Sequence, residues 1–153
     1  AKERDNIFLL IAGEGPLRNK IESEIKSLHL ENKVKLLGHR KDVPKLMKSI
    51  DIYVSSSWSE GLGTSVLEAL ASLKPVVATD AGGVSEMVIN EVTGLLVPAR
   101  NPEKLASAIL YMLDNPEKSQ RFAIEGRKHI EKNFTVDRMI EETIKVYEEL
   151  IIK

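Results

Sequence analysis

The sequence predicts an α/β fold with a parallel sheet that is covered by helices on both faces. Short apolar runs alternate with segments of helical spacing as far as Pro98, and only helical patterns follow that proline. The runs are continuously apolar, as in strands that are buried on both faces. Four of them are followed by glycine-bearing turns, GEGP, GHRKD, SEGLG and AGGVSE. Ligands bind beyond the carboxyl ends of the strands in such folds, so each turn is a candidate wall of a site.

Five strands are predicted, at residues 7–13, 34–38, 51–57, 75–80 and 94–98. Helices are predicted from Leu17 to Leu28 and at residues 42–50, 63–73, 102–115, 116–134 and 135–153. The second of these helices has Asp42 as a candidate N-cap and tolerates Pro44 in its first turn. The last helix carries a broad apolar stripe between Met139 and Leu150. We therefore expect one domain in which alternating strands and helices are followed by a helical extension.

The composition is that of a globular protein and excludes several classes. Of the 153 residues, 42% are hydrophobic and 29% charged, and 22 Lys and Arg balance 23 Asp and Glu. Balanced charge predicts no general affinity for nucleic acid or anionic membrane. The lack of cysteine excludes disulfides and thiolate metal sites, which suits a cytoplasmic location. We see no membrane-length apolar run and no signal peptide, and the start at Ala1 suggests a piece of something longer.

Two of the glycine-bearing turns have ordinary explanations as well as functional ones. GEGP would be half of a dinucleotide fingerprint, but that pattern needs a glycine where Arg18 stands, and no P-loop pattern occurs. AGGVSE, at residues 81–86, is either a plain turn after a strand or the wall of a ligand site, since Gly82 and Gly83 allow close approach of the backbone. The sequence leaves both readings open for this second turn.

The most informative stretch is SEGLGTSVLE, at residues 59–68. Gly61 and Gly63 expose backbone N–H groups at a helix start, where an anion is favoured, and Thr64 adds a hydroxyl donor. Glu60 and Glu68 stand at either end, and Glu68 lies among apolar residues, where a carboxylate needs a partner. Eight residues span up to about 12 Å if all are helical, more than the roughly 5–9.5 Å of a glycosidase pair. We therefore predict a nucleotide sugar, with phosphate on the glycines and hydroxyls on both carboxylates.

The remaining chemistry-bearing residues offer no rival site. His29, His39 and His129 are scattered and form no pair with metal-ligand spacing. Trp58, the only tryptophan, either packs the loop or borders the sugar, and packing is the favoured interpretation.

The motifs taken together resemble the donor-binding half of retaining glycosyltransferases of family 4, the glycosyl transferases group 1. The family pattern E-G-[FL]-G-x-x-x-x-E matches residues 60–68, and PVVAT, GGxxE and TGLLV follow in order. LLIAGEGPLRNKIE and the stretch from VKLLGHRKD to DIYVSSS fit the upstream pattern. The resemblance implies a Rossmann-like domain, one half of a GT-B fold, over residues 1–153.

Family roles then fall on matching residues. Glu60 is the expected catalytic residue, accepting hydrogen bonds from donor-sugar hydroxyls, and Glu68 the acceptor for the ribose hydroxyls. The nucleotide-binding residues that the resemblance and the glycine turn together predict are Gly13, Gly15, His39, Arg40, Gly61, Leu62, Gly63, Thr64 and Glu68. The resemblance implies neither metal nor cofactor. The donor is a nucleoside diphosphate hexose, with UDP as the first expectation and GDP as the second.

One departure from the family bears on activity. The family carries an Arg and a Lys on a strand and helix that precede IFLLIAGEGP, and this sequence shows neither. Because these cations stabilise the leaving diphosphate, we expect weak donor binding and an inactive isolated chain. We expect the domain to be incomplete at its N-terminus and to lack the acceptor-binding half. The enzyme as a whole would act in polysaccharide or glycoconjugate biosynthesis and could touch membrane, of which this domain shows no sign.

Two alternatives to a transferase domain remain. A non-catalytic nucleotide- or sugar-binding module would need no leaving-group cations, although Glu60 favours descent from an active enzyme. A GT-B-type epimerase would need acid and base residues that we do not find in the sequence.

The resemblance also predicts the order of the strands. The first strand of the family's sheet would be missing between residues 7–13 and 51–57, leaving two unpaired edges. We expect these two strands to close up and pair directly. A new strand formed from residues 1–6 between them would contradict that expectation.

Overall fold

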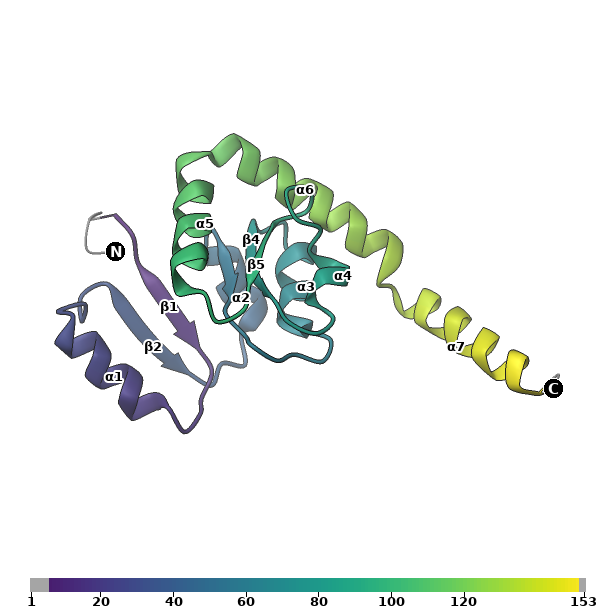
Figure 1. Cartoon of the computed structure of the whole chain (residues 1–153), viewed down its shortest axis with the longest axis horizontal. Helices are drawn as coiled ribbons and strands as arrows, with labels where there is room; N and C mark the ends of the chain where they lie inside the picture. The colour runs from purple at the N-terminus through teal and green to yellow at the C-terminus, as the bar shows by residue number, and fades with distance from the viewer. Residues whose placement is uncertain (1–5, 152–153) are drawn as a thin grey trace. The chain divides into compact units, whose positions relative to one another are not determined.

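The structure is a computed structural model that describes residues 6–151 (Figure 1). Its elements follow the predicted order, with one further short helix, α4 (Val84–Met87), that was not predicted from the sequence. The chain divides into two compact units, Ala1–Val43 and Pro44–Lys153. The assignment of residues 1–153 to one nucleotide-sugar-binding domain stays a prediction.

The first unit contains two parallel strands and one helix. Strand β1 (Leu9–Ala12) pairs with β2 (Val34–Gly38), and helix α1 (Arg18–Ser27) connects them. The register runs from Leu9 opposite Val34 to Ala12 opposite Gly38, with a one-residue shift before Ala12. This parallel βαβ arrangement is the one that the sequence predicts for residues 7–38.

The prediction that the first strand is buried is wrong for this unit. Phe8 is 69% exposed, and Leu9 and Leu10 are also exposed. Helix α1 buries none of its own residues. One helix cannot cover both faces of a two-stranded sheet, so the apolar run keeps much of its surface in this unit.

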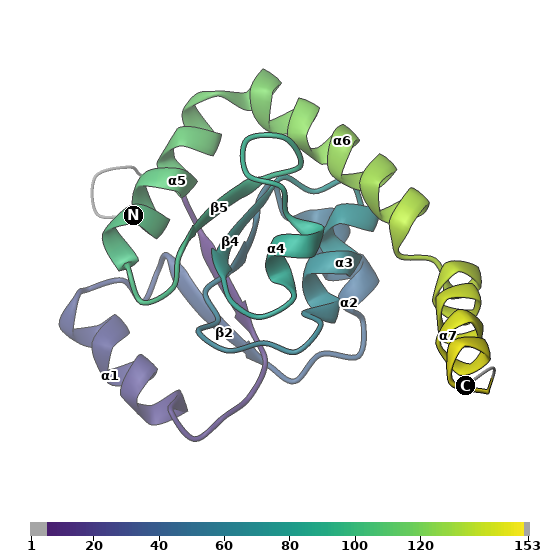
Figure 2. The same ribbon diagram turned by 45° about the vertical axis from the view of Figure 1, so that its right-hand side comes forward.

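The second unit opens with helix α2 (Val43–Ser49), whose first residue is the last of the first unit. It is built on a parallel sheet with the order β3-β4-β5, from Tyr53–Ser55, Val76–Asp80 and Leu95–Pro98. Helices α3 (Thr64–Ala71) and α4 (Val84–Met87) lie on one face of this sheet and α5 (Pro102–Asp114) on the other, as Figure 2 shows. The expected covering of both faces is therefore present here.

The central strand β4 explains why this sheet is stable. Val76, Val77 and Ala78 are all completely buried, as the continuous apolar run predicts. Val77 packs in a cluster with Leu95 of β5 and with residues of the helices beyond it, Ala108, Met112 and Phe122. Burying a side chain of this size contributes about 1.5–3 kcal/mol relative to leaving it exposed, so β4 stabilises the core of this unit.

Two further helices complete the chain. Asn101 caps α5 by accepting a hydrogen bond from the Lys104 amide at 2.9 Å, with Pro102 in the first turn. Helix α6 (Pro116–Asn133) packs closely on α3, since a Cβ at Gly126 would lie 2.6 Å from Leu70 Cδ2. Helix α7 (Val136–Ile151) carries the predicted apolar stripe but buries none of its residues.

The predicted pairing of β1 with β3 would join the two units and stays a prediction. The structure describes one sheet in each unit, β1-β2 in the first and β3-β4-β5 in the second. Strand β3 has three residues, so pairing it with β1 would add few hydrogen bonds. The alternative of a strand from residues 1–6 falls mostly outside the described residues.

No helix in the described part of the chain combines the length and apolarity that crossing a membrane requires.

Candidate functional site

The carboxylate of Glu60 is held in the loop that follows β3. The hydroxyl of Ser57 donates a hydrogen bond to Glu60 Oε1 at 2.6 Å. No donor on the second oxygen, Oε2, is found among the described residues. Because Glu60 is only half-buried, Oε2 can accept a hydrogen bond from a ligand hydroxyl.

A buried hydroxyl on the neighbouring strand anchors the same loop. Thr79, which is 3% exposed, donates to the backbone carbonyls of Ser57 and Ser55, the latter at 3.3 Å. A polar side chain buried in a strand needs such partners, and here one of them, Ser57, belongs to the Glu60 loop, while Ser55 ends β3. Sequence reasoning missed Ser57 and Thr79, although a lone threonine in the apolar run PVVATD was a usable signal.

The turn after β4 contacts the loop that contains Glu60, so it is more than a connection between two elements. Gly83 donates its amide to the carbonyl of Gly61 at 3.1 Å. Gly82 has φ +57° and lies directly against the Glu60 backbone, so that a Cβ there would be 2.9 Å from the Glu60 carbonyl carbon. The AGGVSE turn thus supports the backbone of the predicted site. This is a third role, beside the plain turn and the ligand wall that the sequence left open.

The glycine turn brings the loop into helix α3. Gly63, in the left-handed region at φ +69° and ψ +51°, is the N-cap, and a Cβ there would lie 3.2 Å from Met87 Cε. Its carbonyl accepts the amides of Val66 and Leu67. The N–H groups at the very start of the helix have no intrahelical partner and, with the helix dipole, favour an anion. Gly61, Leu62 and Thr64 are exposed around this start, as an accessible ligand site requires.

Glu68 does not lie in the apolar surroundings that its neighbours in the sequence suggested. It is on the exposed side of α3, while Val66, Ala69 and Leu70 face the core. Its carboxylate therefore stays hydrated and needs no buried partner. The rise of an α-helix places Glu68 about 6 Å beyond Thr64, roughly one turn from the helix start.

Besides burial, the negative charges of Glu60 and Glu68 both affect the pKa of Tyr53. Its hydroxyl donates to Ser65 Oγ at 2.7 Å. Burial raises the pKa of Tyr53; the hydrogen bond with Ser65 opposes this, and the negative charges of Glu60 and Glu68 add to it. The charges of both carboxylates therefore act on the pKa of one tyrosine, which lies in electrostatic range of each end of the E-G-[FL]-G-x-x-x-x-E motif.

The predicted residues of the first unit also lie at the carboxyl ends of their strands. The amide of Gly13 donates to the carbonyl of Gly38 at 2.8 Å, which joins the two loops. The amide of His39 is 3.4 Å from Glu14 Oε1. Gly15, whose carbonyl accepts from the Arg18 amide, stands at the start of α1. These contacts bring Gly13 and His39 into one loop cluster.

Arg40 is engaged within its own loop. Its guanidinium donates to both carboxylate oxygens of Asp42, at 2.8 and 2.7 Å. This hydrogen bond is the first cause of the lowered pKa of Asp42. A ligand that uses Arg40 would have to share it with Asp42.

The favoured interpretation of Trp58 as a packing residue is wrong. Its side chain is 68% exposed, two positions before Glu60. The guanidinium of Arg100, in the loop after β5, lies over the indole ring at 4.3 Å from its centroid. Sequence reasoning did not single out Arg100, although it too follows the end of a strand.

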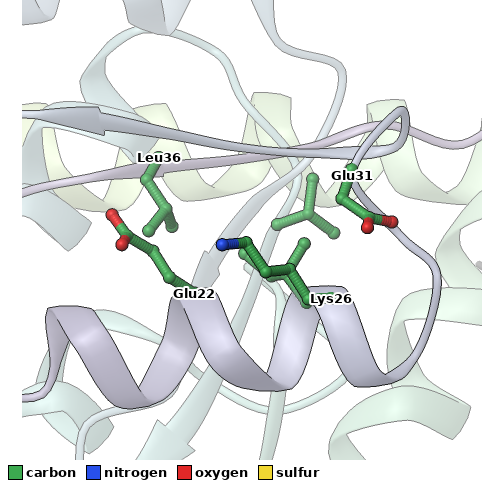
Figure 3. Close-up of a pocket in the computed structure, with 6 residues that line it drawn as sticks. Glu22, Lys26, Glu31 and Leu36 are labelled. Carbon is green, nitrogen blue, oxygen red and sulfur yellow. The ribbon is translucent and has the colours of Figure 1, made fainter.

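A shallow hollow of about 190 Å³ lies elsewhere, between α1 and β2 of the first unit (Figure 3). It is lined by Glu22, Ile25, Lys26, Glu31, Val34 and Leu36. It contains none of the predicted site residues and is smaller than the 300–1,000 Å³ usual for ligand pockets. Within residues 6–151, no group of three or more His, Asp or Glu side chains is placed to hold a metal ion.

The chain is similar to known glycosyltransferases. An uncharacterized glycosyltransferase of Methanocaldococcus jannaschii, MJ1178, is 36% identical over 151 residues, covering 97% of this chain and 42% of that protein. The crystal structure of Anabaena Alr3699/HepE in complex with UDP and glucose has a TM-score of 0.84 and 28% identity, over 94% of this chain and 41% of that one. The chain thus spans about two fifths of the length of these relatives.

A second structure shows which part of the fold is matched. The C-terminal domain of a glycosyl transferase group 1 family protein, LpcC from Francisella tularensis, superposes with a TM-score of 0.81 over 88% of this chain and 73% of that one, at 23% identity. The fold is therefore that of the C-terminal half of a GT-B glycosyltransferase. The family model of glycosyl transferases group 1 matches residues 1–129. This chain belongs to the glycosyl transferases group 1 family.

Proposed function

We propose that this chain binds the donor of a retaining hexosyltransferase, a nucleoside diphosphate hexose with UDP as the first expectation. The observation that carries the proposal is the placement of Glu60. Its carboxylate accepts a hydrogen bond from Ser57 immediately before the exposed residues Gly61 and Leu62, the buried Gly63 and the N-terminus of α3. The carboxylate that can accept hydrogen bonds from sugar hydroxyls is thus adjacent to the helix start that favours an anion, as a sugar diphosphate requires.

Each part of the site has a task for this ligand. The second carboxylate oxygen of Glu60 accepts hydrogen bonds from sugar hydroxyls. The amides at the start of α3 face the diphosphate, whose charge the helix dipole stabilises. Glu68, one turn further along the exposed side of α3, accepts the ribose hydroxyls. In the first unit, Gly13, Gly15, His39 and Arg40 stay the predicted nucleotide-side residues on the resemblance.

The comparisons support the ligand class. Alr3699/HepE has been crystallised with UDP and with UDP-glucose, and both structures align with 94% of this chain. Retention of configuration and independence from metal rest on the resemblance, as does a cytoplasmic location. Because the chain covers about two fifths of its relatives, acceptor binding is assigned to the other part of such enzymes, and we expect no transfer by this chain alone.

Isothermal titration calorimetry with UDP, GDP, ADP and UDP-glucose tests the proposal. We expect heat with UDP and UDP-glucose at dissociation constants of about 0.1–1 mM, equivalent to about −4 to −5.5 kcal/mol. UDP-glucose should bind more tightly than UDP, since only the sugar reaches Glu60. Absence of heat for all four compounds at millimolar concentration would overturn the proposal. Equal affinity for UDP and UDP-glucose would contradict the role of Glu60.

A further inference from the structure

The loops after β3 and β5 place an exposed indole and a guanidinium together. Trp58 follows β3, Arg100 follows β5, and these are the two outer strands of the β3-β4-β5 sheet. Both residues therefore stand at the carboxyl edge of the sheet, where α/β proteins bind ligands. The Arg100 guanidinium carbon is 4.3 Å from the Trp58 ring centroid.

Trp58 is exposed although it is a large apolar residue. Its ring is 68% exposed and so contributes little to the core. Aromatic side chains are among the residues that most often line small-molecule sites. Arg100 covers one face of the ring, so the exposure belongs to the other face and the edge. That second face is available to a ligand.

The backbone on both sides of the pair is constrained. Thr79 holds the carbonyl of Ser57, the residue before Trp58, through a buried hydroxyl. Arg100 has φ +59°, a conformation that is uncommon for residues other than glycine. The following residue, Asn101, is fixed as the cap of α5. The indole and the guanidinium are thus presented by loops that are anchored in the fold.

The chemistry of the pair fits a sugar ring. The face of an aromatic ring is electron-rich, and the C–H groups on one side of a pyranose carry partial positive charge, so the two surfaces attract. Glu60, two positions after Trp58, offers a carboxylate for the hydroxyls of the same ring. An apolar plate beside a few polar groups that fix orientation is the usual composition of a small-molecule site.

We propose that Trp58 and Arg100 form a sugar-binding plate, in which the free face of Trp58 stacks on a pyranose ring and Arg100 holds the indole in place by a cation–π contact. The proposal rests on the proposed function, because it takes its ligand from the same site. We assign the ring to the donor sugar, the sugar that also meets Glu60; a sugar of the acceptor is the alternative outcome that the experiment separates.

Fluorescence gives a direct test, since Trp58 is the only tryptophan of the chain. The chain is titrated with UDP, with UDP-glucose, and with methyl α-glucoside in the presence of UDP. A ring from the donor changes the emission with UDP-glucose and not with UDP. A ring from the acceptor changes it with the glucoside. Emission that responds to neither sugar compound, while calorimetry shows UDP-glucose binding, overturns the plate and leaves the proposed function standing.

Variants give the second readout, by calorimetry with the compound that changes the emission. Trp58→Ala should weaken its binding about fivefold to tenfold, with Trp58→Phe intermediate and UDP affinity unchanged within about twofold. Arg100→Gln, which removes the charge, should weaken it about twofold to threefold. Val92→Ala, an exposed apolar residue in the loop before β5, is the matched control and should bind like the wild type. Wild-type affinity for Trp58→Ala would overturn the plate, and a wild type that binds no compound overturns the plate together with the proposed function.

Discussion

Gly82 lies against the backbone of Glu60, closer than any residue with a side chain could. A Cβ at position 82 would stand 2.9 Å from the Glu60 carbonyl carbon and nearer still to the carbonyl oxygen. With φ +57°, Gly82 also adopts a backbone conformation that side chains disfavour. The turn after β4 therefore determines the position of the loop that contains Glu60.

Gly82→Ala should therefore displace the Glu60 loop. We expect UDP-glucose to bind at least about tenfold more weakly than to the wild type, with a smaller effect on UDP, because the sugar meets Glu60. Overpacking should also lower the free energy of unfolding by about 1–3 kcal/mol. Calorimetry and urea denaturation measure the two effects. Gly15→Ala, where a Cβ meets no atom within 4 Å, is the control for stability, and unchanged UDP-glucose binding in Gly82→Ala would contradict the supporting role.

The two carboxylates of the motif should differ in the part of the ligand that they serve. Glu60→Gln should reduce the affinity for UDP-glucose about tenfold and leave UDP nearly unchanged, because a hydrogen bond to a charged acceptor is stronger than one to an amide. Glu68→Gln should weaken UDP and UDP-glucose by the same factor. Calorimetry with both ligands on both variants gives the comparison. A larger loss of UDP affinity in Glu60→Gln than in Glu68→Gln would mean that the roles are reversed.

Tyr53 should make stability depend on alkaline pH. Its pKa in the folded chain is raised above the ordinary value of 10.0, first by burial. A group of this kind contributes stability that is present below its unfolded pKa and is lost as the pH rises through its folded pKa. Between about pH 8 and about pH 11, the wild type should therefore lose more free energy of unfolding than Tyr53→Phe.

Urea denaturation at the two pH values measures this difference. Tyr147→Phe, at an exposed tyrosine, is the matched control and should follow the wild type. At the lower pH, Tyr53→Phe should be less stable by about 0.5–1.5 kcal/mol, because the hydrogen bond to Ser65 is lost. Parallel pH profiles for wild type and Tyr53→Phe would show that Tyr53 does not titrate in this way.

The order of strands and helices was predictable because each element has its own local signal. Continuous apolar runs predicted β4 correctly, and proline at positions 102 and 116 begins α5 and α6 as helix-start rules require. Burial was less predictable, since it depends on which elements cover which faces. The apolar run at residues 8–10 predicted a buried strand, but these residues are exposed in their unit. The reason is that, among the described residues of this unit, α1 is the one helix available to cover the sheet.

The site was predictable where the chain itself is the signal. Glu60, Gly61, Gly63 and Glu68 are contiguous in one motif, and the structure joins them through the loop and α3. Contacts between distant segments carry no such signal. Gly82 contacts Glu60, which is more than twenty positions away, and Arg100 lies over Trp58, which is more than forty positions away. These contacts follow from the sheet topology alone.

Helix α7 should contribute little to the stability of the second unit. None of residues 136–151 is buried, and the exposed apolar side chains of the helix are Val136, Met139, Ile140, Ile144, Val146, Tyr147, Leu150 and Ile151. Since apolar surface stabilises a fold only when it leaves water, removing residues 136–153 should shift the midpoint of thermal unfolding by less than about 2 °C.

The same truncation should reduce binding of the dye ANS, because the exposed apolar stripe goes with it. Scanning calorimetry and dye fluorescence measure the two effects on the full chain and on the truncated one. A double variant, Ile140→Lys with Ile144→Lys, keeps the helix but interrupts the stripe, and should lower dye binding at an unchanged midpoint. A fall in the midpoint of more than about 4 °C on truncation, roughly 1 kcal/mol for a chain of this size, would mean that α7 packs on the rest of the chain in solution.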